Sequence, residues 1–149
     1  MRSVTPISEG MWNCKMILLD TNIVIDYLNG KEPVTSRVID RIGTIAVSTI
    51  VVAELDYGAK SSANSSKNLQ NLYLFLDLVR IIPFDLASAR MMGTVKSALR
   101  KIGKPTGEVD AMIAAVALTH RAELITSNTR HFQHIAGLRL TNWQLLDTK

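Results

Sequence analysis

Residues 16–28, Met-Ile-Leu-Leu-Asp-Thr-Asn-Ile-Val-Ile-Asp-Tyr-Leu, decide the fold of this chain. Residues 16–19 form an apolar run without polar alternation, which is typical of a parallel strand buried on both faces. Asp20, Thr21 and Asn22 follow at once and predict a turn that caps the next helix. Asp20 therefore stands at the carboxyl end of a strand, the edge at which open α/β sheets bind ligands. Taken alone, this pattern is equally consistent with a simple helix cap.

The composition of the whole chain is that of one globular domain: of its 149 residues, 47% are hydrophobic and 20% are charged. Its 17 Lys and Arg exceed its 13 Asp and Glu, and the net charge of +4 mildly favours an anionic partner. Cys14 is the single cysteine, so an internal disulfide is excluded and a reducing compartment is expected. No apolar run reaches the roughly 18 residues that span a bilayer, so we expect no membrane segment and a cytoplasmic location.

The first fifteen residues differ in pattern from the rest of the chain. They contain Ser, Thr, Pro, Glu and Gly without periodicity, and Met16 then opens the first strand directly. We therefore expect residues 1–15 to be a leader or upstream extension outside the fold, and residues 16–149 to form the domain.

From Met16 onward, strand patterns alternate with helix patterns. Further short apolar runs predict strands at residues 44–48, 79–84, 122–126 and 138–140. Pro83 limits ladder bonding, so it marks either the end of the strand at 79–84 or an edge strand, and we also expect the last strand at an edge. Apolar residues at helical spacing predict helices at 23–28, 34–42, 50–60, 69–78, 85–102 and 108–120, and residues 127–130 read as a turn. The alternation predicts a three-layer α/β/α sandwich with a mostly parallel sheet.

Three acids have equivalent places in this pattern. Asp20 ends the first strand, Glu54 lies one turn into the helix after the second strand, and Asp110 opens the helix at 108–120. Glu54 interrupts a helix predicted to be largely buried, where a carboxylate needs a partner or a metal. Two carboxylates about 4 Å apart repel by about 4 kcal/mol at an effective dielectric near ~20, so a convergent cluster must hold a proton or a cation. Mg²⁺ binds such acids together with phosphate oxygens and can activate a water against a phosphodiester.

Four motifs that contain these acids resemble those of PIN-domain ribonucleases. They are Ile-Leu-Leu-Asp-Thr-Asn at 17–22, Ser-Thr-Ile-Val-Val-Ala-Glu-Leu at 48–55 with Gly58 following, Asp-Ala-Met-Ile-Ala-Ala at 110–115, and Leu-Ile-Thr-Ser-Asn-Thr-Arg-His-Phe at 124–132. No single motif is specific, but four in this order and spacing are a strong signal. Within that family the chain is most similar to VapC-type toxins of toxin-antitoxin pairs, over residues 16–146.

The resemblance implies a Mg²⁺- or Mn²⁺-dependent endoribonuclease, the toxin of a type II toxin-antitoxin system. Such toxins are held inactive by a VapB-type antitoxin, are usually homodimers that also form toxin-antitoxin hetero-oligomers, and commonly cut tRNA or other structured RNA. By motif, Asp20, Glu54 and Asp110 are the catalytic, metal-binding acids. Many family members have a fourth acid after the fourth strand, where this chain has Asn128 and His131. Asn128 is a candidate to orient a metal-bound water, and one metal or two remain open.

Other polar residues are candidates for RNA contact: Asn22, Lys96, Arg100, Lys104, Arg130 and His131. Lys96, Arg100 and Lys104 recur at four-residue spacing, which a solvated helix face explains as well as phosphate contact does. Asn22 lies in the same turn as Asp20 and is as easily explained as a cap residue.

Two other functions fit parts of the sequence. A haloacid-dehalogenase-type phosphotransferase also begins with an apolar strand that ends in Asp, but its mechanism requires a second Asp two residues on, where Asn22 stands. A PIN-like shell that has lost its fourth acid would be a non-catalytic binding module. A covalent aspartyl-phosphate on Asp20 would favour the first alternative, and inactivity on RNA with Mg²⁺ or Mn²⁺ the second.

Overall fold

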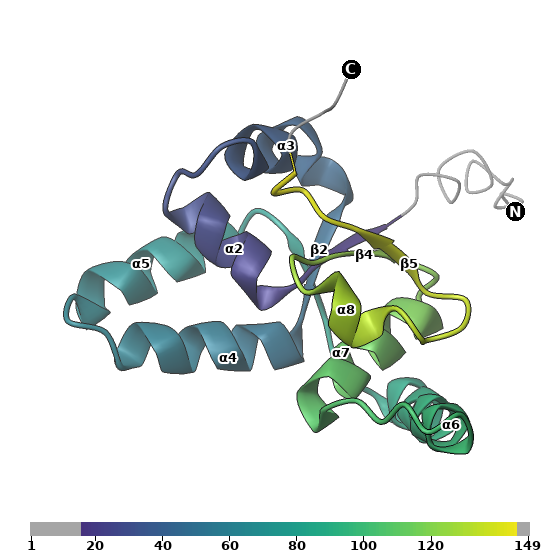
Figure 1. Ribbon diagram of the computed structural model, residues 1–149. Coiled ribbons are helices and arrows are strands. Elements are labelled where there is room, and N and C mark those ends of the chain that lie inside the picture. Colours follow the sequence, from purple (N-terminus) through teal and green to yellow (C-terminus); the bar gives the residue numbers. More distant parts are fainter. Residues whose placement is uncertain (1–15, 146–149) are drawn as a thin grey trace, which may run out of the picture.

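A single parallel sheet forms the centre of the computed structural model, which describes residues 16–145 (Figure 1). Its strands are β1 (Ile17–Leu19), β2 (Ile45–Ser48), β3 (Arg80–Ile82), β4 (Glu123–Ile125) and β5 (Arg139–Thr141). Their order is β3-β2-β1-β4-β5, and every neighbouring pair is parallel. The prediction of a parallel sheet with the third and last strands at its edges is confirmed. The expectation for residues 1–15 lies outside the described residues.

Helices cover both faces of this sheet (Figure 1). One side carries α2 (Thr21–Leu28), α3 (Val34–Asp40), α4 (Thr49–Lys60) and α5 (Ser65–Leu76). The other carries α6 (Leu86–Lys101), α7 (Glu108–Thr119) and α8 (Thr129–Phe132). This follows from right-handed crossovers, because the chain moves outward from β1 to β3 and then returns across the sheet to β4. The predicted three-layer sandwich is confirmed. None of the helices in residues 16–145 combines the length and hydrophobicity of a membrane span.

The centre of the sheet explains the apolar run that opens the domain. β1 pairs with β2 on one side and β4 on the other, and its Leu18 and Leu19 are completely buried. The residues from Ile113 to Ala117 are also buried, because α7 lies between the sheet and α6. Both elements are therefore apolar nearly all round, which fits their positions.

Three segments differ from the sequence prediction. The helix predicted at 69–78 is α5, which begins four residues earlier, at Ser65, and ends at Leu76. Residues 127–130 were predicted as a turn, but α8 begins at Thr129. This helix has only four residues, too few for apolar periodicity, and Phe132, which is 0% exposed, anchors it in the core. The helix predicted at 34–42 ends at Asp40, and Ile42–Thr44 forms a 3-10 turn that leads into β2.

Phe132 should be essential for keeping α8 on the sheet. We expect Phe132→Ala to lower the free energy of unfolding by about 3–5 kcal/mol, because it leaves a cavity in the core. Leu86→Ala is the control, since that side chain is 70% exposed on α6 and its loss should change stability by less than about 0.5 kcal/mol. Urea denaturation measures both, and equal effects of the two substitutions would show that α8 is not anchored in this way.

Candidate active site

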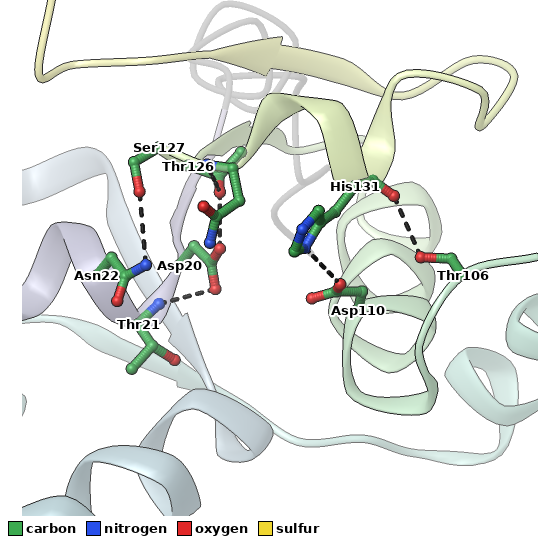
Figure 2. A network of polar contacts seen from close by, with 9 residues as sticks. Asp20, Thr21, Asn22, Thr106, Asp110, Thr126, Ser127 and His131 are labelled. Atoms are coloured by element: carbon green, nitrogen blue, oxygen red, sulfur yellow. Dashed lines mark hydrogen bonds and ion pairs between the residues drawn. The ribbon is translucent and has the colours of Figure 1, made fainter.

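Asp20 joins the central strand to the first helix, as its sequence position predicts. Its backbone N–H donates to the Ile125 carbonyl at 2.9 Å and so extends the pairing of β1 with β4. Its carboxylate accepts two hydrogen bonds: Oδ1 from the Thr21 backbone N–H at 2.8 Å, and Oδ2 from the Thr126 hydroxyl at 2.7 Å (Figure 2). The side chain is only 6% exposed, so these bonds are its main replacement for water.

The surroundings of Asp20 make its negative charge unfavourable. Burial raises the pKa of this carboxyl above its ordinary value of 3.8. The hydrogen bonds from Thr126 and Thr21 oppose this shift, Asp110 raises the pKa of Asp20 further, and His131 lowers it. Asp20 therefore senses both Asp110 and His131, and a cation placed among them would favour the ionised carboxylate.

Asp110 faces the site from the first turn of α7, as predicted. Its Oδ2 lies 3.0 Å from Nδ1 of His131, which is carried by α8 (Figure 2). The backbone carbonyl of His131 accepts a hydrogen bond from the Thr106 hydroxyl at 3.1 Å. Thr106 belongs to the loop before α7, so this bond links the two segments that carry Asp110 and His131.

Glu54 reaches the same edge of the sheet through Thr21. Its Oε1 accepts a hydrogen bond from the Thr21 hydroxyl at 2.6 Å. The prediction of a largely buried helix around it is wrong: within α4 only Val51 and Leu55 are buried, and Glu54 is exposed. Burial therefore does not require Glu54 to be paired, and its link to the site is the bond to the residue next to Asp20.

Asn22 and Asn128 border the Asp20–Thr126 pair. The Asn22 side chain donates to the Ser127 hydroxyl at 3.5 Å (Figure 2). The Asn128 backbone N–H donates to the Thr126 hydroxyl at 3.0 Å, while its exposed side chain makes no cap bond to α8. The Asn128 amide is therefore available to a ligand.

The three basic residues predicted at four-residue spacing are not equivalent: Lys96 and Arg100 lie on α6, whereas Lys104 lies in the loop after it. Lys96 forms an ion pair with Glu108, whereas Arg100 and Lys104 are exposed and have no side-chain partner in residues 16–145. A groove of about 440 Å³ runs along them, lined by Lys96, Ser97, Leu99, Arg100, Pro105 and Thr106. Thr106 links this groove to the backbone of His131. Arg130 on α8 is likewise exposed and unpaired among the described residues.

A second cleft of about 290 Å³ lies beside Glu54, among α2, α4 and α5. Its apolar lining includes Ile25, Leu28, Leu55 and Leu72. Such a surface suits protein side chains better than phosphates.

The sequence did not predict the roles of two threonines. Thr126 donates a hydrogen bond to Asp20, and Thr21 connects Asp20 to Glu54. Thr126 follows β4, which pairs directly with β1 and so brings its hydroxyl to Asp20. The polar residue after an apolar run was a signal, but the sequence pattern alone does not say which strand lies next to β1.

Comparison with known proteins shows the family of this chain. A sequence profile of the PIN domain family matches residues 17–138, a stretch that contains Asp20, Glu54, Asp110 and His131. The chain belongs to the PIN domain family.

Relatives of this PIN domain cover most of its length. It is 38% identical over 128 residues to ribonuclease VapC2 of Haemophilus influenzae, covering 85% of this chain and 96% of the relative. It is 33% identical over 127 residues to the tRNA(fMet)-specific endonuclease VapC of Shigella flexneri, with the same two coverages. Among solved structures, VapBC2 of Rickettsia felis bound to a promoter DNA fragment matches with a TM-score of 0.80 at 32% identity, covering 86% of this chain and 98% of that one. DNA-bound VapBC of Salmonella typhimurium matches with a TM-score of 0.81 at 29% identity, with coverages of 87% and 98%.

The raised pKa of Asp20 predicts a pH-dependent stability in the metal-free PIN domain. The folded protein keeps the Asp20 proton at pH values where the unfolded chain has lost it, so this contribution to stability is present below about pH 3.8 and is lost as the pH rises through the folded pKa. We expect Asp20→Asn to raise the free energy of unfolding at pH 7, with a gain that shrinks toward pH 4.

Urea denaturation in EDTA between pH 4 and pH 8 measures this difference. Asp40→Asn, at the exposed end of α3, controls for the loss of a surface carboxylate. A variant Asp20→Asn that is less stable than wild type at pH 7 would contradict the prediction.

Proposed function

We propose that this PIN domain is a metal-dependent endoribonuclease that hydrolyses RNA phosphodiesters as the toxin of a toxin-antitoxin pair. The observation that carries the proposal is the buried carboxyl of Asp20, which senses a second carboxylate, Asp110, at the carboxyl edge of the sheet. A buried acid whose ionised form is disfavoured, and which is coupled to a second carboxylate, is a candidate cation site in addition to its role as the N-cap of α2. The ribonuclease names of the relatives support the same reaction.

The donors at this edge fit Mg²⁺ or Mn²⁺. Both ions prefer oxygen ligands, which Asp20, Asp110 and Glu54 would supply. When bound, the ion supplies an activated water and stabilises charge on the leaving oxygen. No three acid, His or Cys side chains in residues 16–145 already surround one point, so the proposal is supported by donor chemistry and charge and not by a preformed cage.

The chain's own residues would prepare these donors. Thr126 and the Thr21 backbone hold both oxygens of Asp20 in place, and the Thr21 hydroxyl holds Glu54. We propose that the Asn128 amide orients the attacking water or a phosphate oxygen, because this side chain is exposed and lies next to Thr126. Orientation of this kind can contribute substantially to a hydrolytic rate.

RNA would reach the acids along the basic side of the molecule. Within residues 16–145, Arg100, Lys104 and Arg130 have no charge partner, and the groove on α6 meets the His131 segment at Thr106. Lys96 contributes less than its spacing suggested, because Glu108 already balances its charge. The particular RNA, tRNA or other, depends on features of loop shape that the basic groove does not read.

A VapB-type antitoxin is the proposed protein partner, since several solved relatives are VapBC complexes. The apolar cleft beside Glu54 fits a segment of such a partner, which would then lie next to a metal-binding acid. We also propose that this chain forms a homodimer and that it assembles with the antitoxin into a hetero-oligomer. A small DNA-binding antitoxin encoded in the neighbouring reading frame, whose co-expression relieves growth arrest, would support this assignment.

Membership in the PIN domain family argues against a haloacid-dehalogenase-type phosphotransferase. Asn22 also stands where that mechanism requires a second Asp, and its amide is engaged by Ser127. If the purified protein does not cleave RNA, the alternative function of a non-catalytic binding module is favoured.

Asp20→Asn should abolish RNA cleavage and growth arrest while preserving the fold. We expect the cleavage rate with Mg²⁺ or Mn²⁺ to fall more than about 100-fold, because the ion loses a charged ligand. Asp110→Asn should behave alike, and the surface substitution Asp40→Asn should cleave at the wild-type rate. The assay uses full-length protein freed of antitoxin, with circular dichroism to check folding; cleavage by Asp20→Asn at the parent rate would refute the assignment.

Charge reversal at Arg100, near the end of α6, and at Lys104, just beyond it, should weaken RNA binding in a salt-dependent way. In the uncleaving Asp20→Asn background, we expect Arg100→Glu and Lys104→Glu each to lower affinity and to reduce the slope of log K against log salt by about 0.7. Arg90→Glu is the matched control, an exposed arginine further back on the same helix. Unchanged affinity and salt slope in both test variants would exclude this surface from the RNA path.

A further inference from the structure

His131 occupies the segment in which many PIN-domain nucleases have a fourth acid, and its imidazole touches Asp110. We propose that His131 supplies a nitrogen ligand to the ion held by Asp20 and Asp110, and that this ligand shifts the preference of the site from Mg²⁺ toward first-row transition ions such as Mn²⁺ and Co²⁺. The inference rests on the proposed function, since it assumes that these acids bind a metal.

The position of the imidazole favours ligation over a merely supporting role. A group that only orients Asp110 would lie on the far side of that carboxylate, away from the ion. His131 instead approaches from the side of Asp20: Figure 2 shows its ring between the two acids in this view, and it acts electrostatically on Asp20 as well as bonding to Asp110. The ring therefore borders the space that an ion between Asp20 and Asp110 would use.

The distance between the two donors is also suitable. His131 Nδ1 and Asp110 Oδ2 are 3.0 Å apart. Two ligands at right angles on an ion with bonds of about 2.1 Å are separated by about 3.0 Å, so both atoms can bind one ion with little movement. Without metal, a shared proton satisfies the same pair. When the ion binds, Nδ1 must be free of that proton, which passes to Nε2 or to solvent.

The backbone holds His131 in this position while its ring stays accessible. Thr106 bonds its carbonyl at 3.1 Å, and the adjacent Phe132 is completely buried. The His131 side chain itself is 58% exposed, which leaves room for an ion and its waters. The other histidines are differently placed: His120 caps the far end of α7, and His134 contacts Gln133.

A nitrogen ligand changes which ions bind best. Mg²⁺ is a hard ion that binds oxygen and gives up water reluctantly, whereas imidazole suits transition ions. A neutral imidazole in place of a carboxylate also removes one negative charge from the site, which weakens the attraction for every divalent ion, and the nitrogen donor offsets this loss only for transition ions. The net effect favours transition ions over Mg²⁺.

The ion preference can be measured without any cleavage. Calorimetry with full-length protein, free of antitoxin and of any histidine tag, would give the affinities for Co²⁺ and Mg²⁺. We expect His131→Glu to lower the ratio of Co²⁺ to Mg²⁺ affinity by about tenfold or more, a typical size for a change beside a metal. His134→Gln, three residues further along, should leave the ratio unchanged.

Nitrogen ligation has its own spectroscopic signature. With Mn²⁺ bound, electron spin echo modulation should show coupling to ¹⁴N that changes on ¹⁵N-histidine labelling, is absent in His131→Glu and persists in His134→Gln. Mn²⁺ that binds in an Asp20-dependent manner without nitrogen coupling, together with an unchanged ion ratio in His131→Glu, would overturn this inference and leave the proposed function standing. If Asp20→Asn and Asp110→Asn bind Mn²⁺ as tightly as the wild-type protein does, both this inference and the proposed function are overturned.

Discussion

The buried carboxylate at the end of the central strand is the constraint on which the rest of the site depends. β1 is covered on both faces, so the chain can turn toward polar surroundings only where the strand ends, and Asp20 is the first residue there. Thr21 and Thr126 bond its two oxygens but do not balance its charge. Asp110 adds repulsion from the opposite face of the sheet. The cation proposed for this site would balance that charge, and its proposed ligands, Glu54 and Asp110, come from helices on the two faces of the sheet.

Much of this arrangement was predictable because it follows from burial. Continuous apolar runs identified the parallel strands, and parallel strands present their carboxyl ends at one edge, so the positions of Asp20 after β1 and of Asp110 at the start of α7 were expected. Thr126 was not found in this way, because its contact with Asp20 depends on β4 being the neighbour of β1. Strand order is set by long-range packing, which periodicity does not encode. The short helix α8 was missed for a related reason, since its one anchor, Phe132, makes no periodic pattern.

Charged residues were harder to interpret than apolar ones. Glu54 was predicted to require a partner through burial, yet it is exposed and reaches the site through the Thr21 hydroxyl. Lys96 shares the spacing of Arg100 and Lys104, yet only Lys96 meets an acid, Glu108, across the contact between α6 and α7. A charge on a helix surface has the same local pattern whether it is paired or free. Only the packing of a second helix decides which, and here it separates one lysine from the other two basic residues.

The proposed replacement of a fourth acid by His131 also bears on the number of ions that the proposed site would hold. Four carboxylates would bring four negative charges together, a total that two divalent ions balance. Asp20, Glu54 and Asp110 bring three, and the neutral imidazole brings none. One divalent ion then leaves a single residual negative charge, which a second ion would more than cancel. Because the repulsion that drives ion binding falls with each ion bound, this charge balance favours one tightly held ion, with any second ion dependent on the phosphate of the RNA.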